Sequence, residues 1–258
     1  MKILSWNVNG LKARLDVVNE LVKDIHPGIM CFQKVRKKGD FIINIHDYLG
    51  WLGSMGNTLF GGVSPYIHNA LPLDLEALET FIPEWLRETG CINVINLKSC
   101  YLINLYAPYV DVKNPEYVKT RQRWDYELHE YLVKLSKRKP LIVCGDLNIV
   151  ASYKDAWDEV SVKNSGCFLD WEHRNFDSLM KETGLVYTYR YLHPNERGFT
   201  YFYNNKPEYR LLNQGFRIDY FIVSESILPY VKRSEIFADI MYTTNSPILL
   251  EINLPNKF

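Results

Sequence analysis

The stretch Lys139-Pro140-Leu141-Ile142-Val143-Cys144-Gly145-Asp146-Leu147-Asn148 decides how the rest of this chain is interpreted. Four apolar residues follow the proline, which predicts a short strand that is buried on both faces. Gly145 permits a sharp turn, so Asp146 and Asn148 emerge at the C-terminal end of that strand. Because side chains alternate along a strand, we expect both on the same side. There they could hold a phosphate-bound metal or a nucleophilic water, and a plain Asp/Asn turn is the alternative.

The N-terminal end of the chain repeats this arrangement. Residues 2–8 predict a strand that ends in Asn7-Val8-Asn9-Gly10, with Asn7 and Asn9 on one side. A plain turn is again the alternative. A second short apolar strand, at 29–32, ends in the basic run Gln33-Lys34-Val35-Arg36-Lys37-Lys38. A run of charges is usually a solvated loop.

Composition limits the class of protein. The 258 residues are 47% hydrophobic and 14% aromatic, which supports a sizeable core. Lys plus Arg and Asp plus Glu balance at 30 each, which argues against tight non-specific binding of nucleic acid but permits a local basic patch. The five cysteines form no CxxC pair, so we expect buried thiols in a reducing compartment, with neither a zinc site nor a disulfide framework. With no signal peptide or membrane-length apolar run, we expect a soluble cytoplasmic or nuclear protein that contacts no membrane.

The remaining periodicities predict mainly short strands. Residues 91–97 and 100–106 alternate around Lys98-Ser99, which predicts a hairpin. Further strands are expected at 216–223, 234–240 and 248–254, and helices at 11–24, 117–135 and 172–184. No linker interrupts the chain, so we expect residues 1–258 to form one domain. Many short strands, few helices and two similar polar strand ends favour two packed sheets with helices outside.

Two further stretches each have two interpretations. The segment Arg121-Gln122-Arg123-Trp124-Asp125, inside the expected helix at 117–135, could reach a phosphate backbone or form ion pairs four residues apart. Residues 187–203 are unusually aromatic and could form a contact surface or part of the core.

Taken together, these stretches resemble the exonuclease III / apurinic-apyrimidinic (AP) endonuclease family, within the endonuclease–exonuclease–phosphatase superfamily. The matching segments follow the family order along the whole chain: 5–11, 31–33, 121–125, 139–148, 164–166 and 215–221. The resemblance implies an α/β fold, a four-layer α/β sandwich in which two packed mixed sheets are flanked by helices. It also implies metal-assisted hydrolysis of a phosphodiester 5′ of an abasic site in duplex DNA.

The resemblance carries roles over to individual residues. Tyr106 would contact the phosphate, and Asp146 would orient or deprotonate the attacking water. Asn148 would hold the phosphate oxygens, and Asp219 would support the catalytic histidine.

The resemblance also implies a cofactor and a partner. The cofactor is Mg²⁺, with Asn7 and Asn9 lining the metal end of the site. The partner is double-stranded DNA, bound by a monomer. The residues expected to contact the DNA are Arg36, Lys37, Arg121 and Arg123.

Three positions depart from the family pattern. Lys34 stands where the family has the glutamate that is its main metal ligand, and Thr244 and Asn245 stand where it has Asp and His. Mg²⁺ prefers hard anionic oxygens in octahedral order, so a lysine at the metal position disfavours the ion. We therefore expect a non-catalytic homologue that keeps a face for the DNA backbone. The ammonium of Lys34 would neutralise Asp146 and bind a phosphate without cleaving it, unless Lys34 points to solvent.

Two other functions stay open at this point. One is an active Mg²⁺- or Mn²⁺-dependent repair nuclease, an AP endonuclease or 3′–5′ exonuclease, with a rebuilt metal site. The other is a protein-binding scaffold that uses the aromatic residues of 187–203 as its contact surface.

Overall fold

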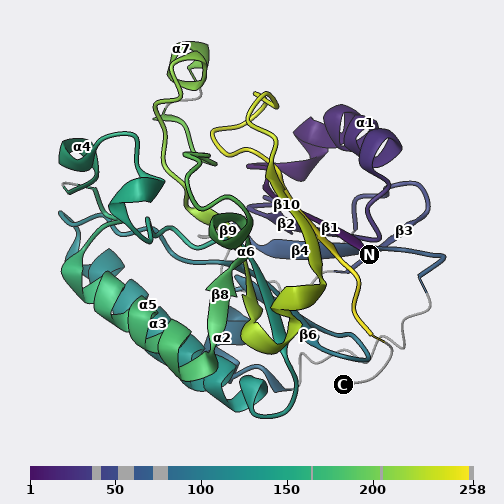
Figure 1. The fold of residues 1–258 in the computed structure, drawn as a ribbon, viewed down its shortest axis with the longest axis horizontal. Coiled ribbons are helices and arrows are strands. Elements are labelled where there is room, and N and C mark those ends of the chain that lie inside the picture. The colour runs from purple at the N-terminus through teal and green to yellow at the C-terminus, as the bar shows by residue number, and fades with distance from the viewer. Residues whose placement is uncertain (37–41, 52–60, 72–80, 164, 204–205, 256–258) are drawn as a thin grey trace.

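Two β-sheets pack face to face, and helices cover their outer surfaces (Figure 1). The computed structural model describes residues 1–36, 42–51, 61–71, 81–163, 165–203 and 206–255. Within this part of the chain, the first sheet has the strand order β10 (Val231–Ile236), β11 (Ile248–Ile252), β1 (Lys2–Asn7), β2 (Ile29–Gln33), β4 (Val63–His68) and β3 (Tyr48–Gly50). The second has the order β5 (Ile92–Asn96), β6 (Tyr101–Tyr106), β7 (Leu141–Asp146), β9 (Asp219–Ser224) and β8 (Leu185–Tyr187). Neighbours are antiparallel except for β1 with β2 and β6 with β7.

The helices form the two outer layers. Helix α1 (Leu15–Ile25) packs on the first sheet, while α3 (Pro115–Ser136), α5 (Asp170–Thr183) and the short α2 (Glu84–Glu88) lie against the second. Three further short helices, α4 (Glu159–Lys163), α6 (Thr188–Leu192) and α7 (Pro207–Leu211), lie in the connections. This is the predicted four-layer α/β sandwich.

Burial on both faces explains why the central strands have continuous apolar sequences. In β7, Ile142 and Cys144 point into the layer between the sheets, and Leu141 and Val143 point toward α3 and α5. Alternation thus places every side chain of the strand in one of two cores. The five cysteines are all buried and unpaired, as the sequence predicts for thiols.

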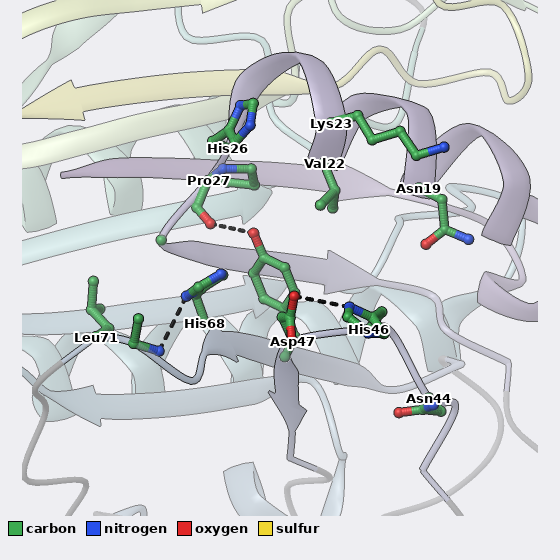
Figure 2. Close-up of a pocket in the computed structure, with 13 residues that line it drawn as sticks. Asn19, Val22, Lys23, His26, Pro27, Asn44, His46, Asp47, His68 and Leu71 are labelled. Carbon is green, nitrogen blue, oxygen red and sulfur yellow. Dashed lines mark hydrogen bonds and ion pairs between the residues drawn. The ribbon is translucent and has the colours of Figure 1, made fainter.

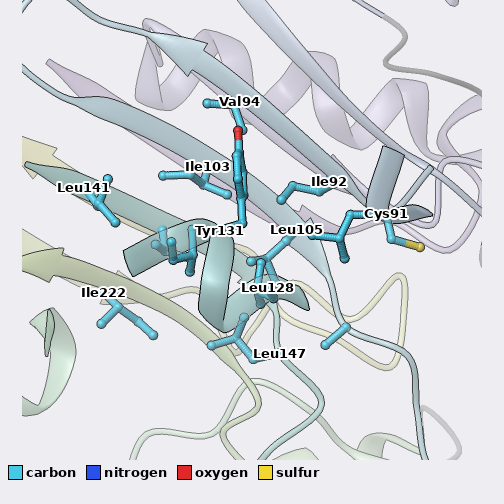
Figure 3. Packing of buried hydrophobic residues seen from close by; sticks show 14 of the residues in the cluster. Cys91, Ile92, Val94, Ile103, Leu105, Leu128, Tyr131, Leu141, Leu147 and Ile222 are labelled. Carbon is cyan, nitrogen blue, oxygen red and sulfur yellow. The ribbon is translucent and has the colours of Figure 1, made fainter. Parts of the chain in front are cut away.

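The outer core of the second sheet depends on α3. Its apolar residues recur every three or four positions, so Leu128 and Tyr131 face the sheet and pack near Ile103 and Leu141 (Figure 3). The helix begins at Asn114, whose side chain accepts a hydrogen bond from the Glu116 amide at 3.1 Å, with Pro115 in the first turn. Each fully buried side chain of this kind contributes roughly 1.5–3 kcal/mol.

The structure corrects three predicted elements. The predicted helix at 11–24 begins with a separate 3-10 turn at Leu11–Arg14, before α1. The predicted strand at 216–223 starts only at Asp219, because the Phe216 backbone pairs with Tyr201 instead. The strand predicted at 234–240 is β10, Val231–Ile236, which is the first strand of the final hairpin. It ends earlier than predicted because the chain turns after Ile236.

The aromatic segment 187–203 combines both proposed environments. Phe199 and Phe202 are buried, whereas Tyr191 and Tyr203 are more than half exposed. A contact surface made by the exposed pair stays a prediction. None of the helices in the described residues is long and apolar enough to cross a membrane.

Two glycines with positive φ make a matched test of the central strand. Gly145 in β7 has φ +131°, and a Cβ there would overlap the carbonyl oxygen of Leu105 in β6. Gly184 ends α5 with φ +63° and has no atom within 4 Å of such a Cβ.

We expect Gly184→Ala to cost about 1 kcal/mol of unfolding free energy from backbone conformation alone. Gly145→Ala adds a clash between paired strands and should cost about 3 kcal/mol or more. Urea denaturation would measure both, and equal losses would contradict the close approach of β6 and β7.

Candidate functional site

Polar side chains gather where four strands end. Because β1 is parallel to β2, and β6 to β7, the carboxyl ends of each pair lie at one edge of their sheet. The last residues of three of these strands are Asn7, Tyr106 and Asp146, and all three are buried. Asp219 begins the antiparallel strand β9 directly opposite Asp146. Strand direction therefore brings together residues that are far apart in the sequence.

Two buried carboxyl groups are bridged by one amide. The Nδ2 of Asn245 donates to Oδ2 of Asp219 at 2.9 Å and to Oδ2 of Asp146 at 3.3 Å. Asn7 Nδ2 also donates to Oδ2 of Asp146, at 2.8 Å. Thr244 Oγ1 donates to Asn245 Oδ1 at 3.0 Å, which fixes the orientation of the bridging amide. Asp219 thus contacts the residue at the position that the resemblance assigns to the histidine.

The segment that carries Asn245 is held from two sides. Trp6 Nε1, in β1, donates to Thr243 Oγ1 at 3.2 Å and to the Asn245 carbonyl at 3.0 Å. From α7, the Arg210 guanidinium donates to the Thr243 carbonyl at 2.6 Å and to Ser246 Oγ at 2.7 Å. These contacts keep the amide bridge in place without any charged side chain in the segment itself.

Electrostatics disfavours a negative charge on both carboxyl groups. Burial, followed by the nearby charge of Asp146, raises the pKa of Asp219 well above its ordinary value. Burial also raises the pKa of Asp146, although the charge of Lys34 and the hydrogen bond from Asn7 act against this rise. Two like charges in a low-dielectric site repel, so the pair favours a shared proton or a nearby cation.

Lys34 supplies such a cation. It follows directly after β2, with φ +50°, and its carbonyl accepts the Gly10 amide at 2.8 Å. Its side chain is half-buried, and Nζ lies 4.6 Å from the ring centroid of Tyr106. Burial and then the charge of Asp146 raise the pKa of Tyr106 well above its ordinary value, so the phenol stays neutral. The ammonium therefore lies over the ring of Tyr106 rather than pointing into solvent.

The expectation that Asp146 and Asn148 alternate along one strand was wrong in detail. Strand β1 ends at Asn7 and β7 at Asp146, and the residues two positions later, Asn9 and Asn148, have φ +46° and +47°. Their backbone amides donate to the side chains two residues before, Asn9 to Asn7 Oδ1 at 3.2 Å and Asn148 to Asp146 Oδ1 at 3.0 Å. These are the Asx turns that the sequence offered as the alternative. The Asn148 amide group donates to the Ala107 carbonyl at 2.6 Å.

The donors at this edge do not fit Mg²⁺. The ion requires several hard, ionised oxygens in near-octahedral order. Here Asp146 accepts hydrogen bonds on both oxygens, Asp219 favours its neutral form, and Lys34 places a positive charge alongside. Asn9 Oδ1 and Asp219 Oδ1 are buried without hydrogen-bond partners among the described residues, but a neutral amide oxygen and a carboxyl group that favours its neutral form do not supply the ionised oxygens that the ion requires. Within the same residues, no three His, Cys, Asp or Glu side chains are close enough to bind a metal.

The predicted DNA contact of Arg121 was wrong. Its side chain is only 3% exposed, because it lies on the face of α3 that packs on the fold. Nε pairs with Asp125 four residues on, at 2.7 Å, which is the ion pair that the sequence offered as the alternative. The guanidinium also donates to the carbonyls of Pro108 at 2.9 Å and Leu147 at 3.2 Å. Arg121 thus joins the two loops that follow Tyr106 and Asp146, a role that sequence periodicity could not reveal.

The other expected DNA contacts differ in exposure. Arg123 is exposed and pairs with Glu127 at 3.1 Å, while its guanidinium lies 4.2 Å from the ring centroid of Trp85. Arg36 is exposed next to the site, and Lys37 lies outside the described residues. Contact of these residues with DNA stays a prediction.

Behind the Asp146–Asp219 pair lies another buried carboxyl group, which the sequence analysis did not identify. Glu172, on α5, has no exposed surface and lies with Oε1 3.4 Å from Nη1 of Arg121. Burial raises its pKa from 4.5 to about 7, although the charge of Arg121 acts against this rise. The loops of the site are therefore tied through Arg121 to a group that changes charge near neutral pH.

Comparison with known sequences identifies related proteins along nearly the whole chain. The sequence model described as the endonuclease/exonuclease/phosphatase family matches residues 4–241. An exodeoxyribonuclease of Bacillus subtilis is 28% identical over 98% of this chain and 100% of its own length. The DNA repair nuclease APEX1 of Danio rerio is 27% identical over 97% of this chain and 81% of its own.

Solved structures share the fold. An AP endonuclease from Archaeoglobus fulgidus superposes with a TM-score of 0.84 at 19% identity, covering 98% of this chain and 100% of its own. A 3′ phosphatase from Neisseria, bound to a product DNA hairpin, superposes with a TM-score of 0.86 at 22% identity and the same coverage. These likenesses show the fold.

Glu172 should give stability a pH dependence that a glutamine lacks. Because folding raises its pKa from 4.5 to about 7, the folded chain keeps a proton that the unfolded chain has already lost in this range. Stability should therefore fall as pH rises from about 4.5 to about 7 and then level off. Against Glu172→Gln, the wild type should lose about 2 kcal/mol over this range in urea denaturation. The exposed Glu130→Gln is the control, and parallel pH profiles for wild type and Glu172→Gln would contradict the raised pKa.

Proposed function

The chain belongs to the endonuclease/exonuclease/phosphatase family, and we propose that it is a DNA-binding member of the exonuclease III/AP endonuclease type in which phosphodiester hydrolysis is impaired. The observation that carries this proposal is the Lys34 ammonium over Tyr106, beside a buried carboxyl pair that an amide already bridges.

Impaired hydrolysis follows from the state of Asp146. A group that activates water needs a free oxygen within hydrogen-bond reach of the water proton. Oδ1 of Asp146 accepts from the Asn148 backbone, and Oδ2 accepts from Asn7 and Asn245. These three hydrogen bonds take three of the roughly four acceptor positions of the carboxylate, and they make it a weaker base than the same buried group would be without them.

The replacement at position 245 acts in the same direction. An imidazole can donate to a phosphate oxygen or to a leaving group and can change its protonation state near neutral pH. The Asn245 amide cannot titrate, and both of its N–H groups are directed at carboxyl oxygens of the protein. Asn245 therefore satisfies the buried carboxyl groups and leaves no proton for a substrate.

Binding of phosphate, by contrast, is supported by the same geometry. The Lys34 ammonium can donate to a phosphate oxygen, and unlike a metal ion it does not lower the pKa of a water to make a nucleophile. Tyr106, under the ammonium, is kept neutral by burial. The relatives are named as DNA nucleases, which makes a DNA backbone phosphate the ligand we propose for this edge.

An incision assay on a duplex with one abasic-site analogue, in Mg²⁺ and separately in Mn²⁺, tests the catalytic half of the proposal. We expect the wild type to be inert, because the charge at position 34 and the amide at 245 oppose metal binding and proton transfer. The triple variant Lys34→Glu, Thr244→Asp, Asn245→His should gain cleavage if the rest of the site is intact. Wild-type cleavage that Asp146→Ala removes would instead show an active nuclease with a rebuilt metal site.

Fluorescence anisotropy with the same duplex tests the binding half. Lys34→Ala should weaken binding roughly three- to tenfold and lower the slope of log K against log salt by about one, as for the loss of a single phosphate contact. Lys134→Ala, an exposed lysine on the outer helix α3, is the matched control and should change neither. If the two substitutions change the affinity and the salt slope equally, Lys34 makes no phosphate contact with the DNA.

A further inference from the structure

A cavity of about 860 Å³ lies on the first sheet, away from the carboxyl pair. It is bounded by the end of α1, the turn into β2 and the ends of β3 and β4 (Figure 2). Its residues Gly28 and His68 lie at the start of β2 and the end of β4, whereas the Asp146 site lies at the other end of β2. The five residues of β2 separate the two by roughly 13 Å at about 3.3 Å per residue. Nothing in the proposed function uses this cavity.

Apolar side chains around the buried Tyr48 form the floor of the cavity. Tyr48 is buried, and its hydroxyl donates to the Pro27 carbonyl at 2.5 Å, so its polar end is already occupied. Its ring meets the His68 ring edge-on, with centroids 5.0 Å apart. Val22 and Leu71 extend the apolar surface on either side (Figure 2). A flat hydrophobic group can bury its faces against such a floor.

His68 is fixed as a hydrogen-bond donor. Its Nδ1 accepts the backbone N–H of Ala70 at 3.1 Å, so this nitrogen carries a lone pair. The ring proton is then on Nε2, for which no hydrogen-bond partner is found among the described residues.

The rim of the cavity is rich in donors and poor in negative charge. Lys23 and His26 lie on the α1 side, and His46 lies opposite. Among the described lining residues Asp47 is the only carboxylate, and its Oδ2 is paired with Nδ1 of His46 at 2.8 Å. Among the described residues, no three metal-binding side chains are close enough to hold an ion.

We propose that this cavity binds a small acid with a flat hydrophobic body, of the class of aromatic phosphate monoesters. The ring of the ligand would lie against the apolar part of the lining around Val22 and Leu71, and the phosphate would accept from His68, while Lys23 on the rim supplies a positive charge that attracts the anion. The volume falls in the range of about 300–1,000 Å³ that is usual for small-molecule sites. An ammonium and a fixed N–H donor suit an anion, and the single carboxylate among the described lining residues is hydrogen-bonded to His46.

Titration calorimetry with phenyl phosphate as the probe tests this site. Binding should saturate, while benzyl alcohol and benzylamine, which share the ring but lack the negative charge, should bind at least about tenfold more weakly, as expected for loss of a charge-assisted hydrogen bond. Lys23→Gln should weaken phenyl phosphate by a similar factor. His68→Phe keeps a flat ring against Tyr48 and removes the donor, so it should do the same. Ala70→Trp fills the cavity from an exposed position and should abolish binding.

Two controls separate this site from the phosphate site proposed at Lys34. Lys34→Ala should leave calorimetric binding of phenyl phosphate to the cavity unchanged, and Lys134→Gln should have no effect. If Lys34→Ala abolishes binding, phenyl phosphate binds at the Asp146 edge and not in the cavity. This result would overturn the proposal made here and would agree with the proposed function. Saturable binding that survives Ala70→Trp, or equal binding of benzylamine, would also overturn it.

Discussion

The hydrogen bonds from Asn245 to Asp146 and Asp219 are the interaction on which this site depends. The two aspartates face each other on the adjacent strands β7 and β9, at the edge of the second sheet. Burying two carboxyl groups side by side is costly unless donors or a cation satisfy them. In this chain one amide, held by Thr244 and by the backbone contacts of its segment, serves both groups, and Lys34 supplies the charge. Under the proposed function, the same contacts that stabilise this edge occupy the groups that hydrolysis would need.

The buried guanidinium of Arg121 links this edge to the outer helix layer. It donates to the carbonyls of Pro108 and Leu147, and it lies next to Asp125 and Glu172. The loops after β6 and β7 are therefore held from behind by an ion cluster in which one carboxyl group titrates near pH 7. Removing one partner of such a buried cluster costs more than its formation contributes, because the remaining charge stays buried. Site geometry and helix packing are thus energetically coupled.

Two polar regions lie near opposite ends of β2. One is the network around Asp146, whose two carboxyl oxygens both accept hydrogen bonds from the protein. The other is the open cavity near His68, where donors such as Lys23 face an apolar floor. A satisfied network favours rigidity, whereas unused donors beside an apolar surface favour a ligand.

The sequence by itself determined the alternation of short buried strands, the hairpin around Lys98-Ser99 and the polar ends of β1 and β7, because these features are local and periodic. Resemblance to a family added the order of the layers and the three positions, Lys34, Thr244 and Asn245, at which this chain lacks the residues of the family pattern. Tertiary structure alone decided that Arg121 is buried, since the face of a helix that meets the sheet depends on packing from other segments. It alone joined His26, His46 and His68 at one cavity, because they come from the end of α1, the loop before β3 and the end of β4, which only the pairing of β2, β3 and β4 brings together.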